Sequence, residues 1–280
     1  LRRSMVRTST RRIYATGLAA FVRIRPEIEK RDTAADTVTS LARPVVVEID
    51  EVRFWTVDAS VGYGTEEELR VSTLLSYDNL FRRGHKVGIS GKWSQILWRG
   101  EATYSTPWLF IVPLNTQLST FVEDRDDPES FTGRFWGSSF QVGQQPRRFF
   151  SYRAGVEVEF VDFVREPNPE EFPDIPTRNT QSLLGGVIFD LREDLFNPRR
   201  GAFASLDGQL AGLGGATTNQ FYKGTGDLRG YLPVAPWLRL ASGINGGYVS
   251  GYGSREDFVP PQERFYFGRD RLRPLRGFDE

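Results

Sequence analysis

Cysteine is absent from this chain of 280 residues, and histidine occurs once. Without cysteine no thiolate zinc site can form, and the lack of stray thiols fits an oxidising compartment. Lysine plus arginine and aspartate plus glutamate number 36 each, so the formal charge is zero. That balance gives no support to a nucleic-acid partner. No stretch approaches the roughly 18 uninterrupted apolar residues of a transmembrane helix.

Aromatic residues and glycine are the types present in excess. Aromatics make up 13% of the chain, with 21 Phe, 10 Tyr and 6 Trp, and glycine occurs 28 times. Many aromatics and many turn-forming glycines, without long helical patterns, indicate a mainly β protein.

From residue 51 onwards, apolar and polar residues alternate with a period of two. In the segment 152–160, tyrosine, alanine, valine and phenylalanine occupy the even positions, and Arg153, Glu157 and Glu159 lie on the opposite face. Such alternation is typical of strands with one apolar and one polar face. About eleven segments of this kind are expected, and they start near Phe54, Glu68, His85, Trp98, Gln117, Gly133, Phe149, Asn179, Gly201, Asn219 and Trp237.

The connections between these segments alternate between short and long. The stretches 82–84, 197–201 and 234–236 are short, whereas 122–133 and 165–179 are long and charged. Short turns at one end, long loops at the other and strands of about ten residues predict a transmembrane β-barrel. Five tryptophans near segment ends fit an interfacial belt, namely Trp55, Trp93, Trp98, Trp108 and Trp237. A soluble β-sandwich is the alternative that alternation alone leaves open.

Residues 1–51 differ from the rest of the chain. A helical pattern runs to Ala15, Gly17 follows as a helix stop, and β-rich runs occupy 21–25 and 43–50. This small α/β piece looks like the C-terminal half of a module.

Four stretches together resemble the superfamily of outer-membrane insertases and transporters that includes BamA and TamA. Residues 11–27 are similar to the end of a POTRA domain, and 56–87, with its GYGTEE and NLFRRG runs, is similar to the first barrel hairpin. Residues 190–201 resemble a periplasmic turn of the family. Residues 260–278, PPQERFYFGRDRLRPLRGF, resemble the loop that carries its VRGF/Y motif.

The resemblance implies a mainly β fold, a transmembrane antiparallel β-barrel preceded by a partial POTRA module. Residues 1–51 would be the POTRA part and 52–280 an incomplete barrel, with the motif-bearing loop at 250–280. About eleven of roughly sixteen strands would be present. The chain is therefore expected to be a fragment at both ends, because an open sheet would leave two unpaired edges in lipid.

The same resemblance assigns the loop motif. In the family, this loop folds back into the barrel lumen, where its arginine pairs with inner-wall carboxylates. Carried over, Arg276 is the lumenal anchor, Gly277 the tight turn and Phe278 a packing residue. Leu275 stands where Val or Ile is usual, and Arg269 departs from the common second glycine.

Two strands are candidates for binding polypeptide. The first barrel strand would form the lateral gate, with Gly62 and Gly64 weakening its pairing and with an outer face of Trp55, Val57, Ala59, Val61 and Tyr63. The POTRA edge strand would bind clients and partners by strand addition through Phe21, Val22, Arg23, Ile24 and Arg25.

The function implied is non-enzymatic assembly of outer-membrane proteins, with no catalytic residue, cofactor or metal. Its location would be the outer membrane of a diderm bacterium, with the POTRA part in the periplasm. Its partners would be unfolded outer-membrane protein clients, accessory lipoproteins or an inner-membrane partner, and the bilayer with its lipopolysaccharide. The alternatives are a two-partner secretion transporter of the same superfamily and, more remotely, a passive porin or a barrel enzyme.

Overall fold

A small α/β unit precedes the main sheet in the computed structural model. The structure describes residues 3–15, 18–26, 45–64, 68–110, 112–126, 132–165, 179–214, 219–235, 237–253 and 258–265. Helix α1 (Arg3–Ala15) packs against β1 (Ala19–Pro26), which pairs antiparallel with β2 (Val45–Glu51). In these ranges, no helix has the length and apolar character needed to cross a membrane.

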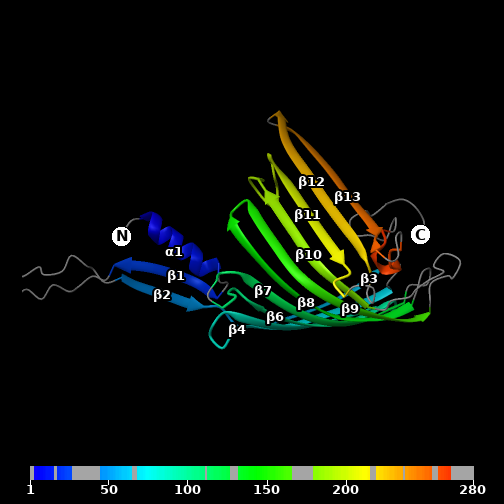
Figure 1. Ribbon diagram of the computed structural model, residues 1–280. Coiled ribbons are helices and arrows are strands. Elements are labelled where there is room, and N and C mark those ends of the chain that lie inside the picture. Colours follow the sequence, from blue (N-terminus) through cyan, green and yellow to red (C-terminus); the bar gives the residue numbers. More distant parts are fainter. Residues whose placement is uncertain are drawn as a thin grey trace, which may run out of the picture.

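The remaining strands form one eleven-stranded antiparallel sheet, and each pairs with its sequence neighbours. Figure 1 shows the sheet curving from β4 round to β13. Strands β3 and β13 are its two edges. The bounds are β3 (Trp55–Gly64), β4 (Glu68–Leu80), β5 (His85–Trp93), β6 (Leu97–Thr106), β7 (Asn115–Asp126), β8 (Thr132–Arg147), β9 (Phe150–Arg165), β10 (Asn179–Asp190), β11 (Gly201–Ala211), β12 (Phe221–Ala235) and β13 (Leu238–Gly251).

The predicted mainly β fold class is confirmed, and each of the eleven expected strands begins within two residues of its predicted start. The reason is the regular period of two, which continues along most of each strand and is interrupted only near strand ends, as between Asp78 and Leu80 or Gln144 and Arg147. The helix up to Ala15 and the two strands of the small unit also lie where their patterns predicted them.

The two faces of the large sheet differ in character. One face carries exposed apolar side chains, such as Val57 at 73%, Ile89 at 65% and Ile244 at 74% exposure. The other carries most of the charged side chains of the strands, together with a small apolar cluster of Phe135, Val161, Phe121 and Phe163. A soluble sandwich would cover the apolar face with a second sheet, and the described ranges contain no such cover. We call the apolar face outer and the polar face inner.

The sheet has a proximal end, which faces α1, β1 and β2, and a distal end (Figure 1). A side chain at Gly84, in the β4–β5 turn, would lie 3.4 Å from Leu18 Cδ1, which fixes this turn at the proximal end. The antiparallel order then places the turns 107–114, 148–149 and 191–200 there too. Trp55, Trp108 and Trp237 lie at the proximal end and Trp93 and Trp98 at the distal end, so all five lie near strand ends, as the predicted interfacial belt requires.

Candidate functional site

Among the residues that the structure describes, the edge of β3 opposite β4 carries a regular row of unpaired backbone groups. Asp78 N donates to Phe54 O at 2.7 Å, and the register places Trp55 opposite Tyr77. In an antiparallel pair, hydrogen-bonded and non-hydrogen-bonded positions alternate. The even-numbered residues of β3 therefore bond to β4, and the odd-numbered ones direct their N–H and C=O groups away from it.

Those odd-numbered residues are five of the six predicted gate residues, Trp55, Val57, Ala59, Val61 and Tyr63, whereas the sixth, Gly62, is even-numbered and faces β4. Their side chains lie on the outer face, with Val61 73% and Tyr63 80% exposed. The inner face holds Thr56, Asp58 and Ser60. The Ser60 hydroxyl lies 2.6 Å from the Ser72 hydroxyl. Gly62 and Gly64 pair with Arg70 and Glu68 at the distal end of the strand. The structure thus puts the gate candidates together on one edge and on one face.

The edge of β1, the predicted client-binding strand, is partly occupied. Val22 N donates to Tyr14 Oη at 3.1 Å, so this N–H points away from β2. Ile24 faces the same way, and Pro26 has no N–H to offer. On one face of the strand, Arg23 and Arg25 form ion pairs with Glu48 of β2, and Phe21 is 44% exposed. Binding of a client at Phe21–Arg25 stays a prediction, and among these three edge positions only the Ile24 N–H has no partner in the described part of the chain.

The inner wall contains an ion network centred on a buried carboxylate. Glu123 is 3% exposed, and its Oε2 accepts from Arg99 Nη1 at 2.7 Å, while Arg125 pairs with its other oxygen. Arg99 also reaches Glu101 at 3.0 Å and lies over the ring of Phe121 at 4.4 Å. Arg99 and Glu101 are two residues apart on β6 and therefore share one face, but the link to Glu123 depends on strand register, which the sequence does not display.

A segment after β13 folds back onto the inner wall. Residues 258–265 include a short 3₁₀ helix, Pro261–Glu263, in which Pro261 is fully buried. Glu263 accepts from Lys223 Nζ at 3.1 Å and from Gln209 Nε2 at 3.4 Å. Gln262 hydrogen-bonds to Glu159 on β9. The segment therefore contacts β11, β12 and β13 and lies next to Glu159 of β9, and we call it the inner latch.

Two glycines of β13 make room for the inner latch. A side chain on Gly251 would meet the backbone of Phe258, and one on Gly247 would meet the ring of Phe265. The latch is the beginning of the loop predicted to enter the lumen. The motif residues Leu275, Arg276, Gly277 and Phe278 lie outside the described residues, and their roles stay predictions.

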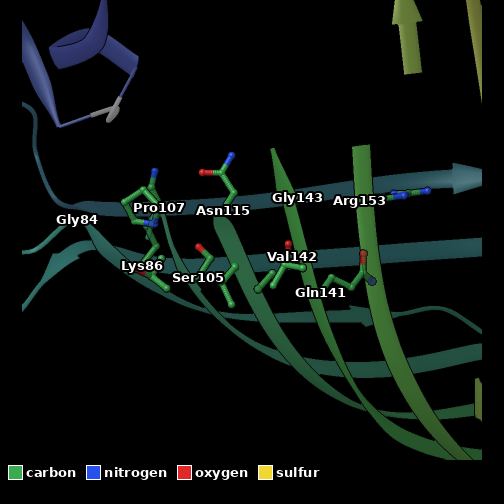
Figure 2. Close-up of a pocket in the computed structure, with 12 residues that line it drawn as sticks. Gly84, Lys86, Ser105, Pro107, Asn115, Gln141, Val142, Gly143 and Arg153 are labelled. Atoms are coloured by element: carbon green, nitrogen blue, oxygen red, sulfur yellow. The ribbon is translucent and has the colours of Figure 1, made fainter. Parts of the chain in front are cut away.

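A cavity of about 480 Å³ lies on the proximal part of the sheet. Figure 2 shows its lining residues in a row across successive strands, from Gly84 and Lys86 to Gln141 and Arg153. Lys86 pairs with Asp78 at 3.1 Å, and Arg153 pairs with Asp207 at 2.6 Å. The remaining lining is mainly uncharged hydrogen-bonding groups. Among the described residues no group of three or more His, Asp or Glu is placed to hold a metal ion.

Comparison with known proteins agrees with this geometry. The model of the Omp85 superfamily domain matches residues 79–280. Among solved structures, the chain is similar to BamA from Haemophilus ducreyi lacking POTRA domains 1–3, with a TM-score of 0.74 and 19% identity. The match covers 91% of this chain and 51% of that chain, so this chain spans about half the length of that relative. The chain belongs to the Omp85 superfamily.

Proposed function

We propose that this chain is part of a non-enzymatic assembly factor that folds client β-barrels into the outer membrane of a diderm bacterium. The observation that carries the proposal is the free edge of β3. Five alternate residues from Trp55 to Tyr63 direct backbone donors and acceptors to one side and apolar side chains to the outer face. An incoming strand can pair with such an edge through main-chain hydrogen bonds.

The edge of β3 has few of the features that usually prevent strand addition. Its sequence, WTVDASVGYG, contains neither proline nor lysine, and its one charged residue, Asp58, lies on the inner face. Natural sheets normally protect an exposed edge with such residues. A strand that must accept another strand needs the opposite composition, which is what β3 has.

The proposal also assigns the two ends of the sheet. The proximal end would face the periplasm, where residues 1–51 act as the last POTRA module and contact clients, accessory lipoproteins or an inner-membrane partner. The distal loops would face the lipopolysaccharide leaflet. The outer face, with its exposed valine, isoleucine and leucine side chains, would contact lipid, which stabilises such a surface.

A proline substitution tests the template role directly. Ala59→Pro removes one N–H from the free edge without removing a β3–β4 hydrogen bond, because Ala59 points away from β4. Ala59→Ser keeps the N–H and is the matched control. In the full-length protein reconstituted in vesicles, we expect Ala59→Pro to slow client folding on the order of tenfold, the loss expected for about 1.4 kcal/mol of pairing, and Ala59→Ser to leave the rate unchanged.

Photo-crosslinking supplies a second measurement that does not depend on the proline variant folding. A crosslinker at Val57 or Val61 should capture the client strand, whereas one at Thr73, which lies opposite Ala59 on β4, should not. Equal capture at Thr73, or client folding at the normal rate with Ala59→Pro, would contradict the proposal.

A two-partner secretion transporter remains the second candidate within the superfamily. It would pass its substrate through the lumen, and the inner latch lies across the wall of that lumen from β9 to β13. Capture of a substrate by crosslinkers at the inner-face residue Gln141, in place of the β3 edge, would favour the transporter.

A further inference from the structure

Three proximal turns carry the same combination of arginine and phenylalanine. The β4–β5 turn contains Phe-Arg-Arg, the β8–β9 turn Arg-Arg-Phe, and the β10–β11 turn Leu-Phe-Asn-Pro-Arg-Arg. We call this set the arginine rim. It consists of Phe81, Arg82, Arg83, Arg147, Arg148, Phe149, Phe196 and Arg199.

The side chains of the rim are exposed and without ionic partners in the described part of the chain. Phe81 is 72% and Phe196 is 98% exposed. Arg82, Arg83, Arg147, Arg148 and Arg199 are exposed too. By contrast, nearby Arg192 pairs with Asp190 at 2.7 Å, and Arg200 pairs with Glu193 at 3.0 Å. The positive charges of the rim arginines are therefore not neutralised by acidic side chains in the described part of the chain.

The β4–β5 turn holds its rim residues in a demanding backbone conformation. Phe81 and Arg82 have φ of 58° and 56°, a left-handed region that favours glycine. The turn is fixed by Arg82 N donating to Asn79 O at 3.0 Å and Gly84 N donating to Asn79 Oδ1 at 3.0 Å. Two large side chains thus occupy positions where glycine would adopt the backbone conformation at a lower free energy, and both are directed to solvent.

The β10–β11 turn is equally well held. Asp194 Oδ1 accepts from the backbone N–H groups of Phe196 at 2.8 Å and Asn197 at 3.1 Å. Arg239, from the start of β13, donates to Asn197 Oδ1 at 2.7 Å and to Pro198 O at 2.9 Å. Phe196 is therefore presented outward by an ordered turn.

Charge is distributed unequally between the two ends of the sheet. Three connections at the distal end are acidic: 65–67 contains two glutamates, 127–131 one aspartate and one glutamate, and 166–178 four acidic residues against one arginine. The arginine rim lies at the same end as the proximal tryptophans Trp55, Trp108 and Trp237. Tryptophan belts mark the depth of lipid headgroups, so the rim lies close to the headgroups.

We propose that the arginine rim binds the anionic headgroups of phospholipids in the leaflet at the proximal end of the barrel. This inference rests on the proposed placement of the sheet in a bilayer. Guanidinium groups form bidentate hydrogen bonds to phosphate, and arginines close to an anionic membrane surface are attracted to it. The neighbouring phenylalanines enter the boundary between headgroups and acyl chains and hold the arginines at that depth.

The test measures lipid selectivity in the full-length protein without any client. The protein is folded into phosphatidylcholine vesicles that contain phosphatidylglycerol with brominated acyl chains, and quenching of tryptophan fluorescence gives the relative affinity for the anionic lipid. The wild type should prefer phosphatidylglycerol, and the preference should fall with salt. Because one arginine near an anionic surface is worth about fivefold, replacing Arg82, Arg83, Arg147 and Arg148 by Gln should lower the preference on the order of tenfold or more.

Two controls separate charge and position from general damage. The same four arginines replaced by Lys keep the charge and should keep most of the preference, and Arg134→Gln, on the outer face at the distal end, should leave it unchanged. If the fourfold variant does not fold, the double variants R82Q/R83Q and R147Q/R148Q should each lose part of the preference.

The inference would be overturned if the wild type showed no preference for the anionic lipid, or if the variant with all four arginines replaced by Gln kept that preference. Either result would point to a protein partner at the rim. Client folding measured in purely neutral vesicles separates this failure from failure of the assembly function, because the rim has no anionic lipid to bind there.

Discussion

The inner latch should be sensitive to a single methyl group at Gly251. In a Gly251→Ala variant the new Cβ would lie 2.8 Å from Phe258 N and 3.0 Å from Phe258 C. These are backbone atoms, so they cannot move aside by a rotamer change. Either β13 or the latch must shift, and overpacking of this kind costs about 1–3 kcal/mol.

The free-energy cost of Gly251→Ala cannot exceed the free energy that holds the latch on the inner wall. If relieving the contact is harder than releasing residues 258–265 from the inner wall, the latch dissociates and the sheet keeps its pairing. A cost of about 1–3 kcal/mol then raises the released population about 5- to 150-fold, since 1.4 kcal/mol is a factor of ten.

Trypsin cleavage after Arg264 measures this population. Arg264 Nε donates to Val259 O at 3.0 Å, so cleavage there requires the latch to open. Gly185→Ala is the matched control, because a side chain at Gly185 meets nothing within 4 Å. Cleavage of the folded protein should be faster in Gly251→Ala and unchanged in Gly185→Ala. Equal cleavage rates and equal urea midpoints in all three proteins would refute the tight contact between β13 and the latch.

Other predictions follow from the ion pairs and the turn. Lys223→Met should release the latch, because Glu263 loses its cation at 3.1 Å, and adding Glu263→Gln should restore protease resistance. Glu123→Gln should lower the free energy of unfolding by about 1–3 kcal/mol, measured by urea titration. The reason is that Arg99 and Arg125 both lose the buried carboxylate with which they pair. The backbone N–H groups of Asn197 and Phe196 hold the pKa of Asp194 below its usual range. The β10–β11 turn is therefore stabilised above the unfolded pKa and loses that contribution as the pH falls through the folded pKa, which proteolysis after Arg199 can follow.

The strands could be predicted because their signal is local. Alternation along each segment fixes both the start of a strand and the face of each side chain, and the starts agreed within two residues. The order of the sheet also followed, since neighbouring antiparallel strands joined by turns pair with each other. The position of the tryptophans near strand ends followed from the same alternation, because Trp93 and Trp98 flank one connection and Trp237 another.

The candidate site was harder to predict from the sequence, because it depends on contacts between residues that are distant along the chain. The direction of the backbone groups of β3 follows from one hydrogen bond between Asp78 and Phe54, which no pattern displays. The contact between Gly251 and Phe258 requires the chain to reverse after β13. The Tyr14 hydroxyl that occupies Val22 N was likewise not predicted, although a tyrosine near the end of an amphipathic helix is a reasonable place to look for such a cap.

Under the assembly function proposed above, the energetics of the β3 edge would favour an exchange of strands over a simple opening. In a closed barrel the odd-numbered backbone groups from Trp55 to Tyr63 would pair with the last strand, and leaving them bare in lipid would cost several kcal/mol for each group. A client strand that replaces the last strand one hydrogen bond at a time avoids that cost, because the number of bonds stays nearly constant. Gly62 and Gly64 weaken the distal part of the pairing, so the exchange can begin there. Such a process needs no nucleotide and no catalytic side chain, only an edge whose free groups, apolar outer face and lack of protecting charges occur together, as they do on β3.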